Sequence, residues 1–157
     1  MTDSSPRLVD GRAPAGYSDR LSLLIHKLSL ELLGRAAEGL GELRLNDRQY
    51  IALAVLAADE PGSQHELGKL MGLAPQLVVA LTDSLEDLGL VTRRTNPNDR
   101  RRTLVELTRE GRRALARADE LTAQTEEDLF AALGDRDREQ LHDALRRAFT
   151  AAYSGPR

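Results

Sequence analysis

The sequence predicts a mainly α-helical protein with one small β-hairpin. Leucine and alanine dominate, and only 3% of the residues are aromatic, a composition that favours packed helices over a β-sandwich. Apolar residues recur at helical spacing along most of the chain. The exception is the stretch from Leu90 to Leu107, where aliphatic and β-branched residues flank the turn-forming segment Asn96-Pro97-Asn98-Asp99, a pattern typical of a hairpin.

Length and composition limit the kinds of protein that this chain can be. Its 157 residues suit one domain, or one domain extended by helices that pair with a second copy. The chain has no cysteine, which excludes disulfides, thiolate metal sites and thiol-based redox sensing. Residues 1–16 lack the apolar core of a signal peptide, and no apolar run approaches the roughly 18 residues of a membrane helix. We therefore expect a soluble, cytoplasmic protein without membrane contact.

The first predicted helix follows a polar tail. Residues 1–16 contain prolines and glycines without apolar periodicity, so we expect a disordered tail. From about residue 17 to 40 apolar residues repeat at helical spacing on two faces. A helix with two apolar faces needs two partners, so we assign residues 17–45 to a dimerisation helix. The leucines and isoleucine concerned are Leu21, Leu24, Ile25, Leu28 and Leu32 on one face and Leu23, Leu30 and Leu33 on the other.

Three further helices are predicted by their capping signals. Asn46 with Gln49 resembles a capping box, and opens a helix that ends near Asp59. Ser63 with Glu66 repeats that signature and opens a short helix, which Gly72 ends. Pro75 then begins a third helix, with Val78, Leu81, Leu85 and Leu88 on one face and Gly89 after its end. Two helices joined by a tight turn containing glycine form a helix-turn-helix.

The predicted hairpin directly follows the helix-turn-helix. We expect residues 90–92 and 103–107 to form its strands. Between residues 93 and 102 five arginines accompany one acid, Asp99, for a net charge of +4 in a chain whose formal charge is −3. Charges are screened over about 8–10 Å at physiological salt, so a clustered patch can attract phosphate whatever the total charge.

Two helices complete the prediction. Thr108 caps a long polar helix over 109–133, and Gly111 in its first turn indicates a close backbone approach to the base of the hairpin. Asp135 begins the last helix. The first of the two has too little apolar surface for a core helix throughout, so we expect an arm that ends, with the last helix, in a dimer interface. The chain then divides into a winged helix-turn-helix over 46–111 and connecting and dimerisation helices over 112–153.

Two motifs in this order resemble the MarR (multiple antibiotic resistance regulator) family of winged helix-turn-helix regulators. Residues 99–111, DRRRTLVELTREG, resemble the family's Asp-x-Arg wing and the Leu-Thr-x-x-Gly entry to its next helix. Residues 81–91, LTDSLEDLGLV, resemble the end of its recognition helix. The resemblance covers about residues 20 to 152. It implies a homodimer that binds double-stranded DNA, with Asp99 and Arg101 as the wing pair and Arg101 in the minor groove.

The candidate DNA-binding residues come from the wing and from a recognition helix that departs from the family pattern. Where family members carry Ser, Thr and Arg, this helix carries one amide and three apolar residues. Gln76 suits adenine and the apolar groups suit a thymine methyl, a thin direct readout. Ala74 replaces the usual cap. Either recognition of DNA depends more on the wing, on backbone contacts and on DNA shape, which we favour, or the operator is read loosely. For Leu77 and Val79 the alternative is that they pack within the domain. The candidates are Gln76, Leu77, Val79, Ala80, Arg93, Arg94, Asp99, Arg100, Arg101 and Arg102.

Many proteins of this family are released from DNA by small aromatic or anionic ligands held between the dimer helices and the winged domain. The residues at corresponding positions are Tyr17, Arg20, His26, Lys27 and Tyr50, with ordinary surface or core-edge roles as the alternative for each. The histidines at 26, 65 and 142 show no i, i+4 pairing, so we expect no metal site, and no cofactor.

The predicted function is that of a sequence-specific repressor, responsive to a ligand, on a pseudo-palindromic operator. An enzyme is not expected, because the chain has no Gly-rich phosphate loop, no His-Glu-x-x-His and no nucleophilic serine elbow, and so no catalytic residues. The competing interpretation is a winged-helix module for protein–protein contact, or an anti-regulator with weak DNA binding. The arginine cluster favours DNA.

Overall fold

The computed structural model describes residues 19–58 and 62–153. Tyr17 and the predicted tail over residues 1–16 lie outside them. The described residues form a mainly helical fold with a small antiparallel sheet. In chain order the elements are α2 (Leu21–Glu42), α3 (Asp47–Ala58), β1 (Gly62–Ser63), α4 (Gln64–Met71), α5 (Pro75–Asp87), β2 (Val91–Asn96), β3 (Asp99–Leu107), α6 (Arg109–Leu129) and α7 (Asp135–Tyr153).

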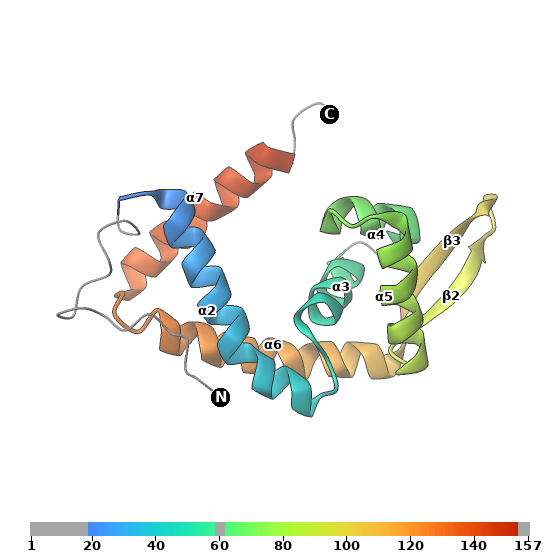
Figure 1. The fold of residues 1–157 in the computed structure, drawn as a ribbon, viewed down its shortest axis with the longest axis horizontal. Helices are drawn as coiled ribbons and strands as arrows, with labels where there is room; N and C mark the ends of the chain where they lie inside the picture. The colour runs from blue at the N-terminus through green and yellow to red at the C-terminus, as the bar shows by residue number, and fades with distance from the viewer. Residues whose placement is uncertain (1–18, 59–61, 154–157) are drawn as a thin grey trace.

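Helix α6 connects two parts of the molecule (Figure 1). At its N-terminal end lie α3, α4, α5 and the β2–β3 hairpin, whereas α7 and the start of α2 lie near its C-terminal end. Helix α2 packs along α6 through a small-residue contact, where a Cβ on Gly39 would lie 3.3 Å from the Leu121 side chain. The predicted arm that extends from the winged domain is therefore present.

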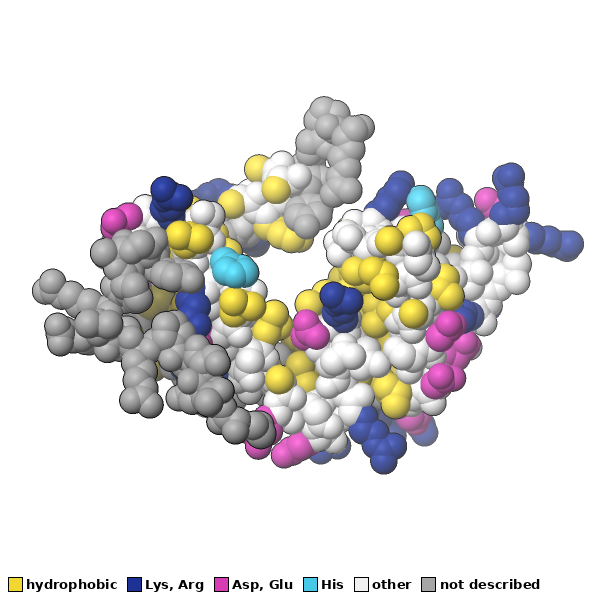
Figure 2. Space-filling model, viewed as in Figure 1, with side chains coloured by type: hydrophobic (Ala, Val, Ile, Leu, Met, Phe, Trp, Pro, Cys, Tyr) yellow, Lys and Arg dark blue, Asp and Glu magenta, His cyan; other side chains and the backbone are white. Residues whose placement is uncertain are grey.

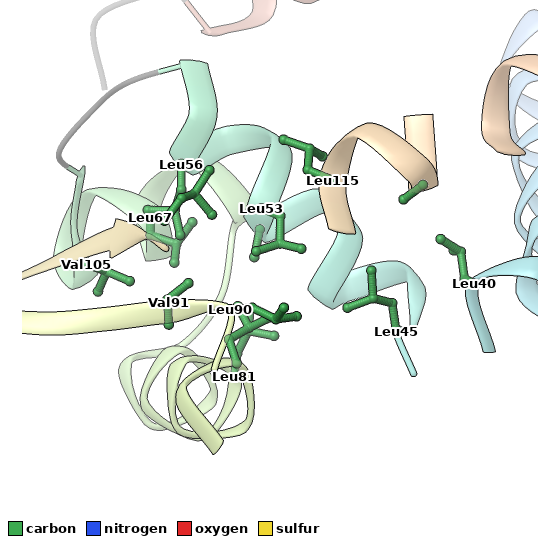
Figure 3. Packing of buried hydrophobic residues seen from close by; sticks show 14 of the residues in the cluster. Leu40, Leu45, Leu53, Leu56, Leu67, Leu81, Leu90, Val91, Val105 and Leu115 are labelled. Atoms are coloured by element: carbon green, nitrogen blue, oxygen red, sulfur yellow. The ribbon is translucent and has the colours of Figure 1, made fainter. Parts of the chain in front are cut away.

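The core lies where the helix-turn-helix meets the base of the hairpin (Figure 3). Leu53 of α3, Leu67 of α4, Leu85 of α5 and Val105 of β3 are at most 1% exposed. Each such side chain contributes about 1.5–3 kcal/mol through burial. Because these residues come from separate elements, their packing fixes α5 and the hairpin base on one support.

The predicted capping signals are confirmed. The Asn46 side chain accepts from the Gln49 backbone N–H at 2.9 Å, and the Gln49 side chain accepts from the Asn46 N–H at 2.9 Å. Ser63 and Glu66 form the same reciprocal pair at the start of α4. Gly72 ends α4 in the left-handed region, with φ 64°, where glycine has no Cβ penalty. These local bonds define where α3 and α4 begin and where α4 ends.

The sheet is larger than the predicted hairpin. Strands β2 and β3 reach to Asn96 and Asp99, because a backbone ladder can continue through Thr and Arg residues without an apolar pattern. A third strand, β1, pairs with β3 so that Gly62 lies opposite Val105 and Ser63 opposite Leu104. With only 2 residues, β1 is too short to show the period-two pattern by which strands are predicted.

Helix α6 ends at Leu129, before the predicted position 133. The chain turns over residues 130–133, and the Arg138 Nε donates to the Phe130 and Leu133 carbonyls, each at 3.2 Å. The guanidinium thereby ties the start of α7 to the turn after α6, where the Phe130 carbonyl also accepts from the Leu133 backbone N–H at 2.9 Å. Helix α7 begins at Asp135, as predicted.

Apolar side chains remain exposed on α2 and α7. Leu21 is 72% exposed and Phe149 is 64% exposed. No described side chain of α7 is buried. Such surfaces are typical of helices that pack against another chain. The other exposed large apolar residues of these helices are Ile25, Leu28, Leu30 and Leu145.

Candidate nucleic-acid interface

Helix α5 presents a distinct outer face. Its inner face buries Val78, Leu81, Thr82 and Leu85. All four predicted groove-facing residues, Gln76, Leu77, Val79 and Ala80, are exposed. Leu77 is 47% exposed and Val79 is 46% exposed. The alternative in which these two side chains pack within the domain is therefore wrong.

The start of α5 depends on proline and on a close neighbour. Ala74 occupies the N-cap without a side-chain hydrogen bond, as predicted, and Pro75 follows in the first turn. A backbone N–H at that position would have no partner within the helix, so proline loses no hydrogen bond there. A Cβ on Gly68 of α4 would lie 2.8 Å from a methyl carbon of Val78. Glycine at position 68 thus lets α4 and α5 approach closely enough to form the helix-turn-helix.

The outer surface of α5 carries no basic residue. The charged residues of this helix are Asp83, Glu86 and Asp87, and all of them are acidic. Affinity for DNA comes mainly from cations that neutralise phosphates. Any such cations must therefore lie on neighbouring elements.

The hairpin, which we call the wing, supplies arginines in an irregular part of its ladder. Thr95 pairs with Thr103, but the next residue, Asn96, pairs with Asp99. The intervening residues 100–102 of β3 consequently have no partner in register on β2. Bulges of this kind redirect side chains and increase local twist. Arg100, Arg101 and Arg102 all lie in this segment.

Asp99 holds this segment in place. One carboxylate oxygen accepts from the Arg101 backbone N–H at 3.1 Å and lies 3.3 Å from the Arg101 Nε. The other oxygen lies 3.5 Å from the Arg102 Nε. The Arg101 side chain is nevertheless 93% exposed. Arg100 is also exposed and forms no ion pair with any residue that the structure describes. The predicted Asp99–Arg101 pair is thus formed, with the guanidinium facing solvent.

Two other wing arginines have acidic partners but remain accessible. Arg94 pairs with Glu106 on the adjacent strand, and its side chain is 60% exposed. Arg102, 52% exposed, lies 3.8 Å from Glu66 at the start of α4. Hydrogen bonds from the Ser63 backbone and side chain lower the pKa of Glu66, which favours its charged form.

Arg93 lies apart from the wing tip. Its guanidinium contacts α5, 2.5 Å from Asp83 and 3.4 Å from Glu86, and the side chain is only 23% exposed. Its charge is therefore already compensated within the protein. The structure does not bring Arg93 together with the other predicted DNA-binding arginines.

Charge is unevenly distributed across this surface (Figure 2). Dark blue side chains project from the hairpin tip and over α4, whereas magenta ones gather over α5. The cations thus surround the helix instead of covering it. Arg48 of α3, which the sequence analysis did not single out, lines a hollow of about 210 Å³ together with Leu77, Ala80 and Ser84 of α5.

The base of the wing contacts the start of α6 through Gly111. A Cβ at this position would lie 2.0 Å from the Leu90 carbonyl oxygen, so only glycine fits. The Thr108 backbone N–H donates to the same carbonyl at 3.0 Å, and the Thr108 hydroxyl donates to the Gly89 carbonyl at 2.7 Å. The predicted close approach is confirmed.

The residues that hold Arg93 were missed in the sequence. Asp83 and Glu86 lie one turn apart on α5, and buried Thr82 lies beside them. An acid pair at i, i+3 directly before an arginine-rich hairpin was the available signal. It was not decisive, because the same spacing is common on any solvated helix face.

The predicted ligand-binding residues do not form one cluster. Arg20 and His26 are exposed, and Lys27 pairs with Glu31 at 3.7 Å, all at the start of α2. Tyr50 lies on α3, where its hydroxyl donates to Asp119 of α6 at 3.0 Å. Burial raises the pKa of Tyr50. Tyr17 lies outside the described residues.

Other kinds of site find little support in residues 19–58 and 62–153. No group of three or more His, Cys, Asp or Glu side chains in this part of the chain is arranged to hold a metal ion. None of its helices combines the length and apolar character needed to cross a membrane.

Comparisons with known proteins show which family this chain resembles. A family model described as MarR family matches residues 45–102. A putative transcriptional regulatory protein for the hcr operon of Thauera aromatica is 34% identical over 100 residues, which span 64% of this chain and 60% of that protein. The match thus covers less than two thirds of this relative's length.

Solved structures are similar over longer ranges. A MarR-family transcriptional regulator from Rhodococcus sp. RHA1 is 29% identical with a TM-score of 0.76, covering 88% of this chain and 99% of that one. The transcriptional repressor CouR bound to a 23-mer DNA duplex is 30% identical with a TM-score of 0.76, covering 85% and 95%. CouR from Rhodococcus jostii RHA1 bound to p-coumaroyl-CoA is 28% identical with a TM-score of 0.74, covering 89% and 96%. The chain belongs to the MarR family of transcriptional regulators and has its winged helix fold.

Proposed function

We propose that this chain is a sequence-specific DNA-binding repressor that acts as a homodimer in the cytoplasm and is released by a small ligand. One observation supports DNA binding most strongly. Exposed Arg100 and Arg101 lie on a bulged segment of the wing, and the wing is attached through Arg93 to α5, whose outer face is exposed. A helix flanked by projecting arginines suits a major groove between two phosphate backbones.

In this proposal α5 enters the major groove and the wing reaches the adjacent minor groove. Gln76 bonds an adenine edge, and Leu77, Val79 and Ala80 contact thymine methyls. Arg101 enters the minor groove, where a planar, weakly hydrated guanidinium suits the negative potential of a narrow groove. The Asp99 carboxylate holds the Arg101 backbone, which limits the conformations open to this side chain.

Contacts with the phosphate backbone come from cations around α5. Arg94, Arg100 and Arg102 serve this role on the wing, and Arg48 serves it beyond the outer face of α5. Such contacts set the register of the protein on DNA without reading sequence. They also compensate for the acidic residues of α5.

Dimerisation is supported by the exposed apolar faces of α2 and α7. A two-fold dimer built on these helices binds half-sites about 10–10.5 base pairs apart, or a multiple of this spacing. Sedimentation of a chain truncated before Arg136 tests the interface. Loss of the dimer is expected, and a stable dimer without α7 would rule this interface out.

Ligand control is supported by the CouR structure with p-coumaroyl-CoA, a ligand that is both aromatic and anionic. In this chain Arg20 and Lys27 offer cations, His26 offers an imidazole that can form hydrogen bonds, and Tyr50 offers an aromatic ring, as does Tyr17. Thermal unfolding with a panel of aromatic acids and their CoA thioesters tests the idea. A bound effector is expected to raise the melting temperature and to weaken DNA binding.

A second function has one observation in its favour. The acidic and apolar surface of α5 would suit a protein partner, in a module or anti-regulator that binds DNA weakly. The salt dependence of DNA binding separates the two functions. A repressor that neutralises several phosphates loses affinity steeply with salt, by about 0.9 logarithmic units per contact for each tenfold rise in salt.

The test is a selection from randomised duplexes with the purified chain, followed by fluorescence anisotropy. The expected product is an inverted repeat that binds with a steep salt dependence. The test variant is Arg100→Ala with Arg101→Ala, and the control is Arg113→Ala, since Arg113 is 66% exposed in the first turns of α6, outside the proposed dimer helices. No enriched repeat, or equal losses for both variants, would contradict the proposal.

A further inference from the structure

Arg93 differs from the other arginines of the wing in every contact. One of its terminal nitrogens lies 2.5 Å from the Asp83 carboxylate, and the other lies 3.4 Å from Glu86. The first nitrogen also donates to the Val79 carbonyl at 3.2 Å and to the Thr82 hydroxyl at 2.5 Å. All of these partners belong to α5. The guanidinium therefore attaches β2 to this helix.

The attachment extends beyond the side chain. The Arg93 backbone N–H donates to Glu86 at 3.3 Å, so this one carboxylate holds both the strand and the guanidinium. Thr82, which is 0% exposed, also accepts from the Gln64 side chain of α4 at 2.6 Å. The contacts thus link α4, α5 and β2 in one network.

The wing has few other ties to α5. The two are joined by a short turn around Gly89, which has a φ of 70°. The buried wing residues Val91, Leu104, Val105 and Leu107 pack into the core near its base. The outer part of the hairpin has exposed or half-buried side chains. Its direction relative to α5 is therefore sensitive to contacts just above the base, where Arg93 lies.

We propose that Arg93 is a positioning residue, which fixes the angle between the wing and α5 and makes no contact with DNA. The inference deepens the proposed function and rests on it. A protein that places one element in each groove must hold the two at the spacing of the duplex. This role explains why a helix that faces DNA phosphates carries the acidic residues Asp83 and Glu86: their carboxylates anchor Arg93.

Two matched variants separate positioning from direct contact. Arg93→Met removes the guanidinium but keeps an aliphatic stem. Arg94→Met removes the same charge one residue later, where the partner is Glu106 of the hairpin itself. Both proteins are compared by amide hydrogen exchange without DNA and by anisotropy on the selected duplex over a range of salt concentrations.

The expected results differ in kind. Arg93→Met speeds amide exchange in β2 at least tenfold and weakens specific binding at least tenfold, with the salt slope unchanged. Arg94→Met leaves exchange in β2 near the wild-type rate and lowers the salt slope by about 0.9, the value for one phosphate contact. A salt slope that falls by this amount in Arg93→Met, with normal exchange, would overturn the inference.

The acidic partners provide a test in which the two explanations predict opposite signs. Asp83→Asn with Glu86→Gln removes two negative charges from the side facing DNA, which by electrostatics alone strengthens binding. If these carboxylates anchor Arg93, specific binding instead weakens at least tenfold. Stronger specific binding would overturn the inference. This variant also retains the arginine, so it serves if Arg93→Met fails to fold.

Failure of the proposed function is distinguishable from failure of this inference. If the wild-type chain selects no duplex, DNA binding is wrong, and amide exchange alone then decides whether Arg93 fixes the wing. If the wild-type chain binds and all of these variants bind and exchange as it does, DNA binding stands and the positioning role is wrong.

Discussion

The wing tip and the outer face of α5 belong to two elements that meet at Arg93, but they have opposite chemistry. The tip carries three arginines in a segment without ladder partners, while α5 carries one amide, three apolar side chains and three acids. In the proposed complex, the wing thus supplies most of the attraction to DNA and α5 supplies a limited reading of bases. Affinity and base preference then depend on different residues and can be altered separately.

The largest expected effect is on folding stability, and it comes from the contact between Gly111 at the start of α6 and the base of the wing. In Gly111→Ala the new Cβ would lie 2.0 Å from the Leu90 carbonyl oxygen. Overpacking a rigid site typically costs 1–3 kcal/mol, and a backbone contact this short is expected to cost about 3 kcal/mol or more. Urea unfolding measures the loss. Gly41→Ala is the control, because nothing lies within 4 Å of its added Cβ. Equal stability of the two variants would contradict the close contact.

The next largest effect tests the contribution of the wing to DNA binding, apart from that of α5. Arg101→Ala is expected to weaken operator binding by about 1–3 kcal/mol and to reduce the salt slope by about one contact. The side chain is 93% exposed, so folding stability should not change. Anisotropy over a salt series measures both quantities. Unchanged affinity and slope would remove the wing from the proposed interface.

A smaller effect is expected from the outer face of α5, which is proposed to read the bases. Gln76→Ala should lose about 1 kcal/mol of discrimination at one base position and leave the salt slope unchanged, because an amide neutralises no phosphate. Repeating the duplex selection with this variant measures it. The same base preferences for both proteins would mean that α5 does not read sequence through this residue.

The smallest effect is a pH dependence at Glu66, which faces both the start of α4 and Arg102 of the wing. Hydrogen bonds from Ser63 lower its pKa from the ordinary value of 4.5. A lowered pKa in the folded state stabilises the protein above 4.5, and this contribution is lost as the pH falls through the folded-state pKa. The stability difference between the wild type and Glu66→Gln should therefore shrink below pH 4.5. A difference that is constant with pH would contradict this assignment.

The parts of the fold that could be predicted from the sequence depend on neighbours along the chain. Asn46 with Gln49 and Ser63 with Glu66 are capping pairs three residues apart, and their bonds form as expected. Gly111 was also informative, because a glycine in a first helical turn weakens the helix unless a close contact requires it.

The features that were missed depend on contacts between distant residues. Arg93 and Arg94 are neighbours in the sequence with the same chemistry, yet one packs on α5 and the other pairs across the hairpin. Successive side chains of a strand point to opposite faces, so only one of the two can face α5. Which one does so depends on where α5 packs, and that position has no local signal in the sequence. Strand β1 likewise exists only because Gly62 and Ser63 meet β3.

The register shift in the wing has a consequence for how proteins of this kind diversify. Residues 100–102 lie outside the paired ladder, between Asp99 and Thr103. Inserting or deleting one residue within a paired strand would exchange its inward and outward side chains, and so expose Val105 and Leu107. A change within residues 100–102 leaves that alternation intact. This short segment can therefore accept insertions, deletions and changes of charge, in evolution or in design, without altering the packing of the strands below it.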